Sequence, residues 1–177
     1  DDEDRVWVDG LPVGETITLE VRALASYSRS GEGLHRYTDP EDGEVYLYTQ
    51  FEPNDAHRAW PCVDQPDVKP EWTFHVIAPA GWVVSSNGVE TAVEVVDDSG
   101  ALRHDFTATR PLSSYITAIV AGPWAVIEGG TWSGGASDGG HAELELRLLC
   151  RRTLARYLDS DDVFEVTRAG LDFFHER

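Results

Sequence analysis

The sequence contains no methionine, only one lysine and only two cysteines among its 177 residues. Cys62 and Cys150 lie far apart and form no CxxC pair, which excludes both a disulfide framework and a cysteine-rich zinc motif. We therefore expect free thiols in a reducing compartment, with Cys62 packed and inert beside Trp60 and Pro61. This pattern favours a cytoplasmic protein.

Long apolar runs are missing as well. No stretch approaches the roughly 18 apolar residues of a membrane span, and no signal peptide opens the chain, so we predict no membrane partner. Acidic residues number 32 against 14 basic ones, giving a formal net charge of −18. Such a chain repels phosphate backbones, which argues against nucleic acid as a partner, and it attracts cations and amines. A merely solvated acidic surface is the alternative explanation.

The common catalytic motifs are also absent. The six histidines include no pair at i, i+4, and there is no G-x-S-x-G elbow, P-loop or G-x-G-x-x-G. His175-Glu176 could open an HExxH motif, but Arg177 is the last residue, and a surface pair at a helix end is the simpler interpretation. The chain starts without methionine and ends without a helix stop signal, so we expect a piece of a longer protein with no complete catalytic or metal site.

Apolar and polar residues alternate along much of the chain, which is typical of half-buried strands. The pattern is clear over residues 16–25, 71–76 and 143–148, and the continuous apolar run 115–121 suits a central strand. Residues 92–96 and 102–108 predict a hairpin across 97–100. Gly129 to Gly140 holds six glycines and predicts a flexible surface loop. We predict a mainly β fold, a curved antiparallel β-sandwich or saddle-like sheet.

The last segment changes period. Val163, Val166, Gly170, Phe173 and Phe174 fall at helical spacing. This predicts a helix from near Asp162, capped by Ser160 or Asp161. We therefore expect a β domain over residues 1–158, followed by a linker and helix over 159–177 that begin the next domain.

The stretch Tyr46 to Pro66 is the part arranged for recognition. On a strand, Tyr46, Tyr48, Gln50 and Glu52 share one face, while Leu47, Thr49 and Phe51 share the other. Pro53 stops the strand, which places Glu52 at a sheet end, where binding groups are often displayed. Two neighbouring hydrogen-bond acceptors suit an ammonium group such as a peptide α-amine. A polar, solvated strand face is the alternative.

The loop that follows, residues 54–67, holds one arginine among three aspartates. We expect a buried Arg58–Asp64 ion pair that locks this loop and supports Glu52 without taking part in chemistry.

These residues resemble the amino-terminal domain of zinc aminopeptidases of the aminopeptidase N type. The resemblance rests on Thr49-Gln50-Phe51-Glu52 and on Asp55 to Pro66, read against T-Q-[FL]-E-x-x-D-A-R-R-[AMC]-[FW]-P-C-[WF]-D-E-P. Further ordered matches are Gly33-Leu34-His35-Arg36, Val84 to Gly88, Pro111 to Tyr115 and Val120 to Trp124. The residues in these motifs most resemble the bacterial cytoplasmic, particularly actinobacterial, branch of the family. His57, Val63, Gln65 and Pro70 depart from the family pattern.

The resemblance implies a domain that packs against its own thermolysin-like catalytic domain. That domain would hold the zinc, the HExxH motif and the G-x-M-E-N motif, none of which this chain contains. By position, Gln50 and Glu52 would help to bind the free α-amine of peptide N-termini, and the fragment alone would be inactive. Two alternatives stay open: a free-standing β-sandwich binding module, and a family member with lost or altered chemistry.

Overall fold

The structure is a computed structural model that describes residues 7–135 and 141–175. The chain forms two compact units. The first comprises residues 1–38 and 45–122, and the second comprises residues 39–44 and 123–177. The predicted domain boundary near residue 158 stays a prediction, because a compact unit of the chain need not coincide with a domain.

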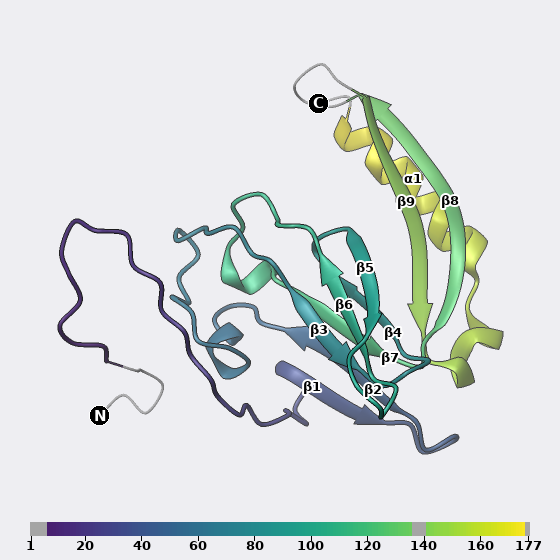
Figure 1. Cartoon of the computed structure of the whole chain (residues 1–177). Coiled ribbons are helices and arrows are strands. Elements are labelled where there is room, and N and C mark those ends of the chain that lie inside the picture. The colour runs from purple at the N-terminus through teal and green to yellow at the C-terminus, as the bar shows by residue number, and fades with distance from the viewer. Residues whose placement is uncertain (1–6, 136–140, 176–177) are drawn as a thin grey trace. The chain divides into compact units, whose positions relative to one another are not determined.

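The first unit contains two antiparallel sheets (Figure 1). The four-stranded sheet has the order β1 (Gly33–Thr38), β2 (Val45–Gln50), β7 (Ile119–Gly122) and β4 (Val83–Ser86). The three-stranded sheet has the order β3 (His75–Ala78), β6 (Leu102–Phe106) and β5 (Glu90–Val95). Two short 3₁₀ helices, η1 (Ala56–Arg58) and η2 (Ser114–Ile116), lie in the connections.

Both sheets of this unit contribute to one hydrophobic core. Leu47, Val84 and Ala121 come from the four-stranded sheet, and Ala78 and Phe106 come from the three-stranded sheet. The first three lie side by side, because Leu47 pairs with Ala121 and Val84 pairs with Ala121 across the strands. The alternation in the sequence thus places one face of each sheet in a shared interior, which confirms the predicted mainly β, sandwich-like class.

The second unit is a hairpin with helices. Its elements are β8 (Ala125–Gly135), β9 (His141–Cys150), the 3₁₀ helix η3 (Arg152–Tyr157) and α1 (Ser160–His175). Asp39, only 2% exposed, accepts hydrogen bonds from Arg151 at 2.8 Å and Thr153 at 2.6 Å. The Thr153 hydrogen bond is the main cause that lowers the pKa of Asp39. This ionic contact ties the turn 39–44 to the segment that follows β9.

Helix α1 begins two residues before the predicted start. Asp159, and neither Ser160 nor Asp161, caps it, because its carboxylate accepts the Asp162 amide at 3.3 Å. Phe164 is the buried residue of the helix and packs on Gly129 of β8, where an added Cβ would come within 2.2 Å of the ring.

Several sequence predictions about elements were wrong in whole or in part. Residues 16–25 form no strand, and Ile17, Leu19 and Val21 are between 42% and 58% exposed. Alternation marks a segment able to pair, but among the described residues no strand pairs with this one. Gly129–Gly135 belongs to β8 and is not a loop, while 136–140 lie outside the described residues. In the run 115–121, the part from Ile119 is a central strand as predicted, since β7 lies between β2 and β4, but the part before it is η2 and not strand.

Replacing Gly129 by alanine tests the packing of α1 on the hairpin. The new methyl group would overlap the Phe164 ring, so Gly129→Ala should lower the free energy of unfolding by about 1–3 kcal/mol in urea denaturation. Gly170→Ala in α1 is the matched control. No atom lies within 4 Å of its added Cβ, and alanine favours a helix by up to about 1 kcal/mol over glycine. Equal effects of the two changes would contradict this account of the packing.

Candidate functional site: the end of strand β2

Strand β2 ends at Gln50, and the chain then turns at residues 52–54. Gln50 and Glu52 are both exposed, whereas Phe51 between them is only 1% exposed. The Asp55 amide donates to the Phe51 carbonyl at 2.8 Å and closes the turn. Tyr46 lies on the same face as Gln50 but is 1% exposed, so the open part of that face begins at Tyr48. The sheet therefore presents one amide and one carboxylate to solvent at its end.

An aromatic cluster holds Phe51 in place. Its ring meets Trp60 edge-on, with ring centroids 4.9 Å apart, and Trp60 in turn lies 5.4 Å from Phe74 and 6.4 Å from Trp72. The Trp72 indole N–H donates to the Leu112 carbonyl at 2.9 Å. Large aromatic rings in such contact contribute strongly to packing, so the backbone on both sides of Phe51 is fixed from the interior.

The predicted Arg58–Asp64 pair was wrong. The Arg58 guanidinium instead donates to Asp55 at 3.1 Å and reaches Glu32 at 3.5 Å, and its side chain is 42% exposed. The hydrogen bond with Asp55 raises the pKa of Arg58. Asp55 stands three residues before Arg58 in the 3₁₀ turn, so it is the nearer acceptor. Arg58 thus joins the turn after Glu52 to Glu32, which immediately precedes β1.

Asp64 has other partners. Its carboxylate accepts the His57 backbone amide at 3.1 Å, the His57 ring nitrogen Nδ1 at 2.9 Å and the Ser114 hydroxyl at 2.5 Å. Burial by itself raises the pKa of Asp64, but the hydrogen bonds from Ser114 and His57 outweigh it and leave the pKa below its ordinary value. Asp64 thus holds His57 and Ser114, and its support of Glu52 stays a prediction.

The segment 113–119 is the part of the site that sequence reasoning missed. Ser113 donates to the Pro66 carbonyl at 2.5 Å, and the Ile119 amide donates to the Thr49 hydroxyl at 2.9 Å. Asn87 holds the segment from another side, through the Ile116 carbonyl at 2.9 Å and the Ala118 amide at 2.6 Å. Thr49, Pro66, Asn87 and Ser113 stand in the matched motifs, but the motifs alone do not show that the first three meet the segment 113–119.

Cys62 has no role in nucleophilic chemistry at neutral pH. Burial, followed by the nearby Asp64 charge, raises the pKa of its thiol to about 11. Since the thiolate is the reactive form, Cys62 stays protonated and serves as packing. Both cysteines are half-buried free thiols.

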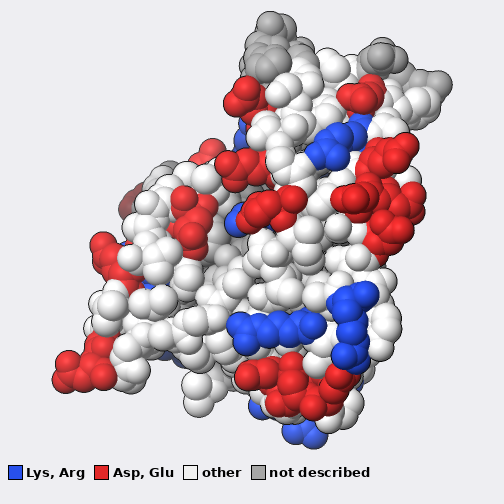
Figure 2. All heavy atoms as spheres, turned by 90° about the vertical axis from the view of Figure 1, so that its right-hand side faces the viewer, with Lys and Arg blue, Asp and Glu red and all other residues white. Residues whose placement is uncertain are grey.

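The described residues offer no metal centre. Nowhere in residues 7–135 and 141–175 do three or more histidine, cysteine, aspartate or glutamate side chains gather in a group that could hold an ion. The acidic side chains lie in separate patches on the face drawn in Figure 2, interrupted by a few basic ones.

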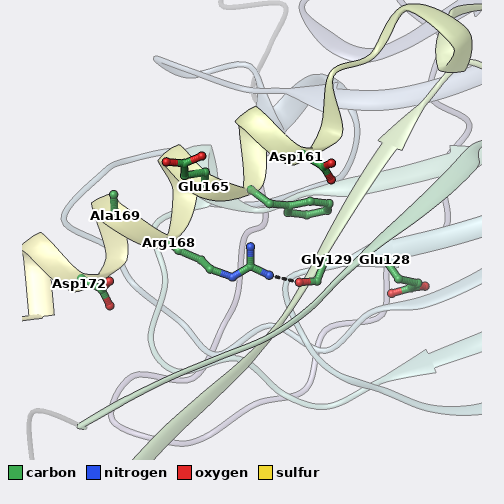
Figure 3. A pocket seen from close by; sticks show the side chains of 8 residues that line it. Glu128, Gly129, Asp161, Glu165, Arg168, Ala169 and Asp172 are labelled. Atoms are coloured by element: carbon green, nitrogen blue, oxygen red, sulfur yellow. Dashed lines mark hydrogen bonds between the residues drawn. The ribbon is translucent and has the colours of Figure 1, made fainter.

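A hollow of about 510 Å³ lies in the second unit, between β8 and α1. Figure 3 shows Arg168 reaching across it to donate to the Gly129 carbonyl. Four carboxylates also line it, from Glu128, Asp161, Glu165 and Asp172. Asp172 accepts the Trp132 indole N–H at 2.7 Å, so this carboxylate has a structural role. The hollow is thus a feature of helix packing, separate from the end of β2.

Comparison with known proteins decides the family. The profile of the peptidase M1 N-terminal domain matches residues 6–116. The chain belongs to this family. The aminopeptidase N of Streptomyces lividans is 41% identical over 175 residues, which are 99% of this chain and 19% of that protein. The aminopeptidase N of Haemonchus contortus is 33% identical over 127 residues, covering 70% of this chain and 13% of its own length.

A mammalian protein is also similar to the chain. The mouse glutamyl aminopeptidase is 31% identical over 104 residues, which are 58% of this chain and 11% of that protein. The chain therefore spans less than a fifth of the length of these M1 relatives. The resemblance to an amino-terminal domain of the aminopeptidase N type, with an actinobacterial relative, is confirmed. In the described part of the chain, no helix has the length and apolarity to cross a membrane.

Mutating Asp64 tests the hydrogen-bond network by its pH dependence. Because the folded pKa of Asp64 is lowered, its carboxylate stabilises the fold above the unfolded value of about 3.9, and this stabilisation is lost as pH falls through the lower folded value. Asp64→Asn should cost about 1–3 kcal/mol of unfolding free energy at pH 7. In urea titrations the difference from wild type should shrink below about pH 4.

The control for this experiment is Asp98→Asn, which alters an exposed carboxylate in the turn between β5 and β6. It should leave the unfolding free energy within about 0.5 kcal/mol of wild type at either pH. A difference between wild type and Asp64→Asn that stays the same at pH 7 and pH 3 would contradict the lowered pKa.

Proposed function

We propose that this domain anchors the free α-amine of peptide substrates in a full-length M1 aminopeptidase that removes amino-terminal residues. Gln50 and Glu52 are the anchoring residues. The observation that carries the proposal is their exposure on either side of the buried Phe51, at the end of a strand whose packing is fixed from within. Membership of the M1 family supports the peptide as substrate class.

The chemistry of the two side chains fits an ammonium group. An α-amine has a pKa near 8 and is largely protonated at pH 7, so it presents three N–H donors. The Glu52 carboxylate and the Gln50 amide oxygen both accept hydrogen bonds. One charge-assisted hydrogen bond contributes roughly 1.5–3 kcal/mol, which corresponds to on the order of tenfold to a hundredfold discrimination against a blocked amine.

The surrounding charge also favours a cation. Asp55 and Glu32 lie near the turn and share the single Arg58 guanidinium, and the whole chain has a net charge of −18. A negative field raises the local concentration of a positively charged ligand and speeds its association. Holding the ammonium at a fixed point orients the first peptide bond, which is the contribution of this domain to the reaction.

The resemblance implies zinc in the intact enzyme, but the described residues of this chain do not fit a metal. We assign zinc to the remainder of the full-length enzyme. We also place there the domain against which this one packs. The role of this chain is binding and orientation. Its two free cysteines support a reducing, cytoplasmic setting for the enzyme.

Removing the carboxylate tests the proposed amine anchor. In the full-length enzyme, Glu52→Ala should lower kcat/KM on free-amine peptides by tenfold or more, since about 1.4 kcal/mol of binding corresponds to a factor of ten. Glu71→Ala, which removes another exposed carboxylate of the same unit, is the control and should leave kcat/KM near wild type. An unchanged kcat/KM in Glu52→Ala would contradict the assignment of Glu52 as the amine anchor.

The isolated chain supplies a second test. Purified residues 1–177 should have no aminopeptidase activity on amino-terminal amide substrates and should not retain stoichiometric zinc. Elemental analysis of the purified, dialysed chain measures the zinc that it retains. One zinc per folded chain would overturn the assignment of the metal to the rest of the enzyme.

A further inference from the structure

The hydrogen-bond ladder between β2 and β7 stops just before the proposed anchor. Paired residues are Leu47 with Ala121 and Tyr48 with Val120. Beyond them the Ile119 amide donates to the Thr49 hydroxyl at 2.9 Å, so a side chain replaces the backbone acceptor. On the opposite side, β1 continues to pair with β2 as far as Gly33 and Gln50. Towards β7, Thr49 therefore supplies the hydrogen bond nearest to Gln50.

The partner of Thr49 is itself firmly held. Asn87 contacts the Ile116 carbonyl and the Ala118 amide, and Ser86 donates to the Ala118 carbonyl at 2.8 Å. Thr117 is 3% exposed and donates to the Ser114 carbonyl at 2.5 Å. Buried polar groups that are fully hydrogen-bonded make a segment rigid, because each broken bond leaves an unsatisfied group.

The same segment also reaches the loop that follows Glu52. Ser114, 2% exposed, donates to the Asp64 carboxylate, and Ser113, also 2% exposed, donates to the Pro66 carbonyl. Asp64 in turn holds His57 in η1, a few residues after Glu52. One rigid segment thus contacts the chain immediately before Gln50 and the loop after Glu52.

We propose that Thr49 and Ser114 are positioning residues that set the spacing between the Gln50 amide and the Glu52 carboxylate for the substrate ammonium. This inference rests on the proposed function. Thr49 fixes β2 to the segment 113–119 on the Gln50 side, and Ser114 fixes the same segment to the loop on the Glu52 side. Neither residue contacts the ligand. Together they tie the chain on both sides of the two acceptors to one rigid segment, so that both acceptors can bind one ammonium.

The test measures recognition of the amine separately from turnover. In the full-length enzyme, competitive inhibition constants are determined for leucinol and for N-acetyl-leucinol, neither of which has an amino-terminal peptide bond to cleave. The constant of the acetylated compound divided by that of the free amine reports discrimination for the free amine. Thr49→Val keeps the shape of the side chain but removes the acceptor, so the ratio should fall by about tenfold, as for a lost binding contribution of about 1.4 kcal/mol. Ser114→Ala should lower it in the same direction.

The matched variants separate positioning from general stability. Thr49→Ser restores the hydroxyl and should restore the ratio. Thr91→Val removes a hydroxyl that donates to the Asp105 carbonyl at 3.1 Å in the other sheet, and it should leave the ratio unchanged whatever it does to the unfolding temperature. A purely structural role for Thr49 would lower the unfolding temperature and leave the ratio intact, and that result would overturn the inference.

Glu52→Gln in the same assay distinguishes the two proposals. If it lowers the ratio while Thr49→Val and Ser114→Ala do not, the amine anchor stands and the positioning inference fails. If Glu52→Gln leaves the ratio unchanged, the anchor fails and the positioning role fails with it. Should Thr49→Val not give folded enzyme, Ser114→Ala tests the same frame from the side of Glu52.

Discussion

The burial of Phe51 is the interaction on which the exposure of Gln50 and Glu52 depends. A strand places neighbouring side chains on opposite faces, so a ring drawn into the aromatic cluster turns the side chains before and after it outward. Gln50 and Glu52 owe their exposure to this alternation and to the turn that follows. The interior of the domain thereby determines which side chains are exposed at the end of β2.

A second constraint is that the motifs of the chain lie far apart in sequence but converge at one end of the four-stranded sheet. Thr49 contacts Ile119 across 70 residues, and Asp64 contacts Ser114 across 50. Non-local hydrogen bonds of this kind are costly in chain entropy, and they are retained where a loop must take one conformation. The motifs around Thr49, Asp64, Asn87 and Ser114 are therefore parts of one local structure.

Much of the fold followed from local sequence patterns, and the failures share a cause. The hairpin of β5 and β6 was predictable from alternation on either side of a turn, and the buried Phe51 from its place between polar neighbours. The partners of Asp64 were not, because charge favours arginine, whereas the fold brings His57 and, from η2, Ser114. Residues 16–25 show the same limit. Alternation predicts that a segment can form a strand, but whether a partner strand lies beside it depends on the fold.

The large negative charge also affects association between copies of the domain. Helix α1 exposes Val166 at 65% and Phe174 at 78%, and Leu24 is fully exposed in the amino-terminal segment. Exposed apolar groups of this size favour self-association, and a net charge of −18 opposes it through repulsion between copies. The many carboxylates of the chain thus keep its copies apart in dilute salt. Acid or high ionic strength removes that repulsion and leaves the apolar side chains free to associate.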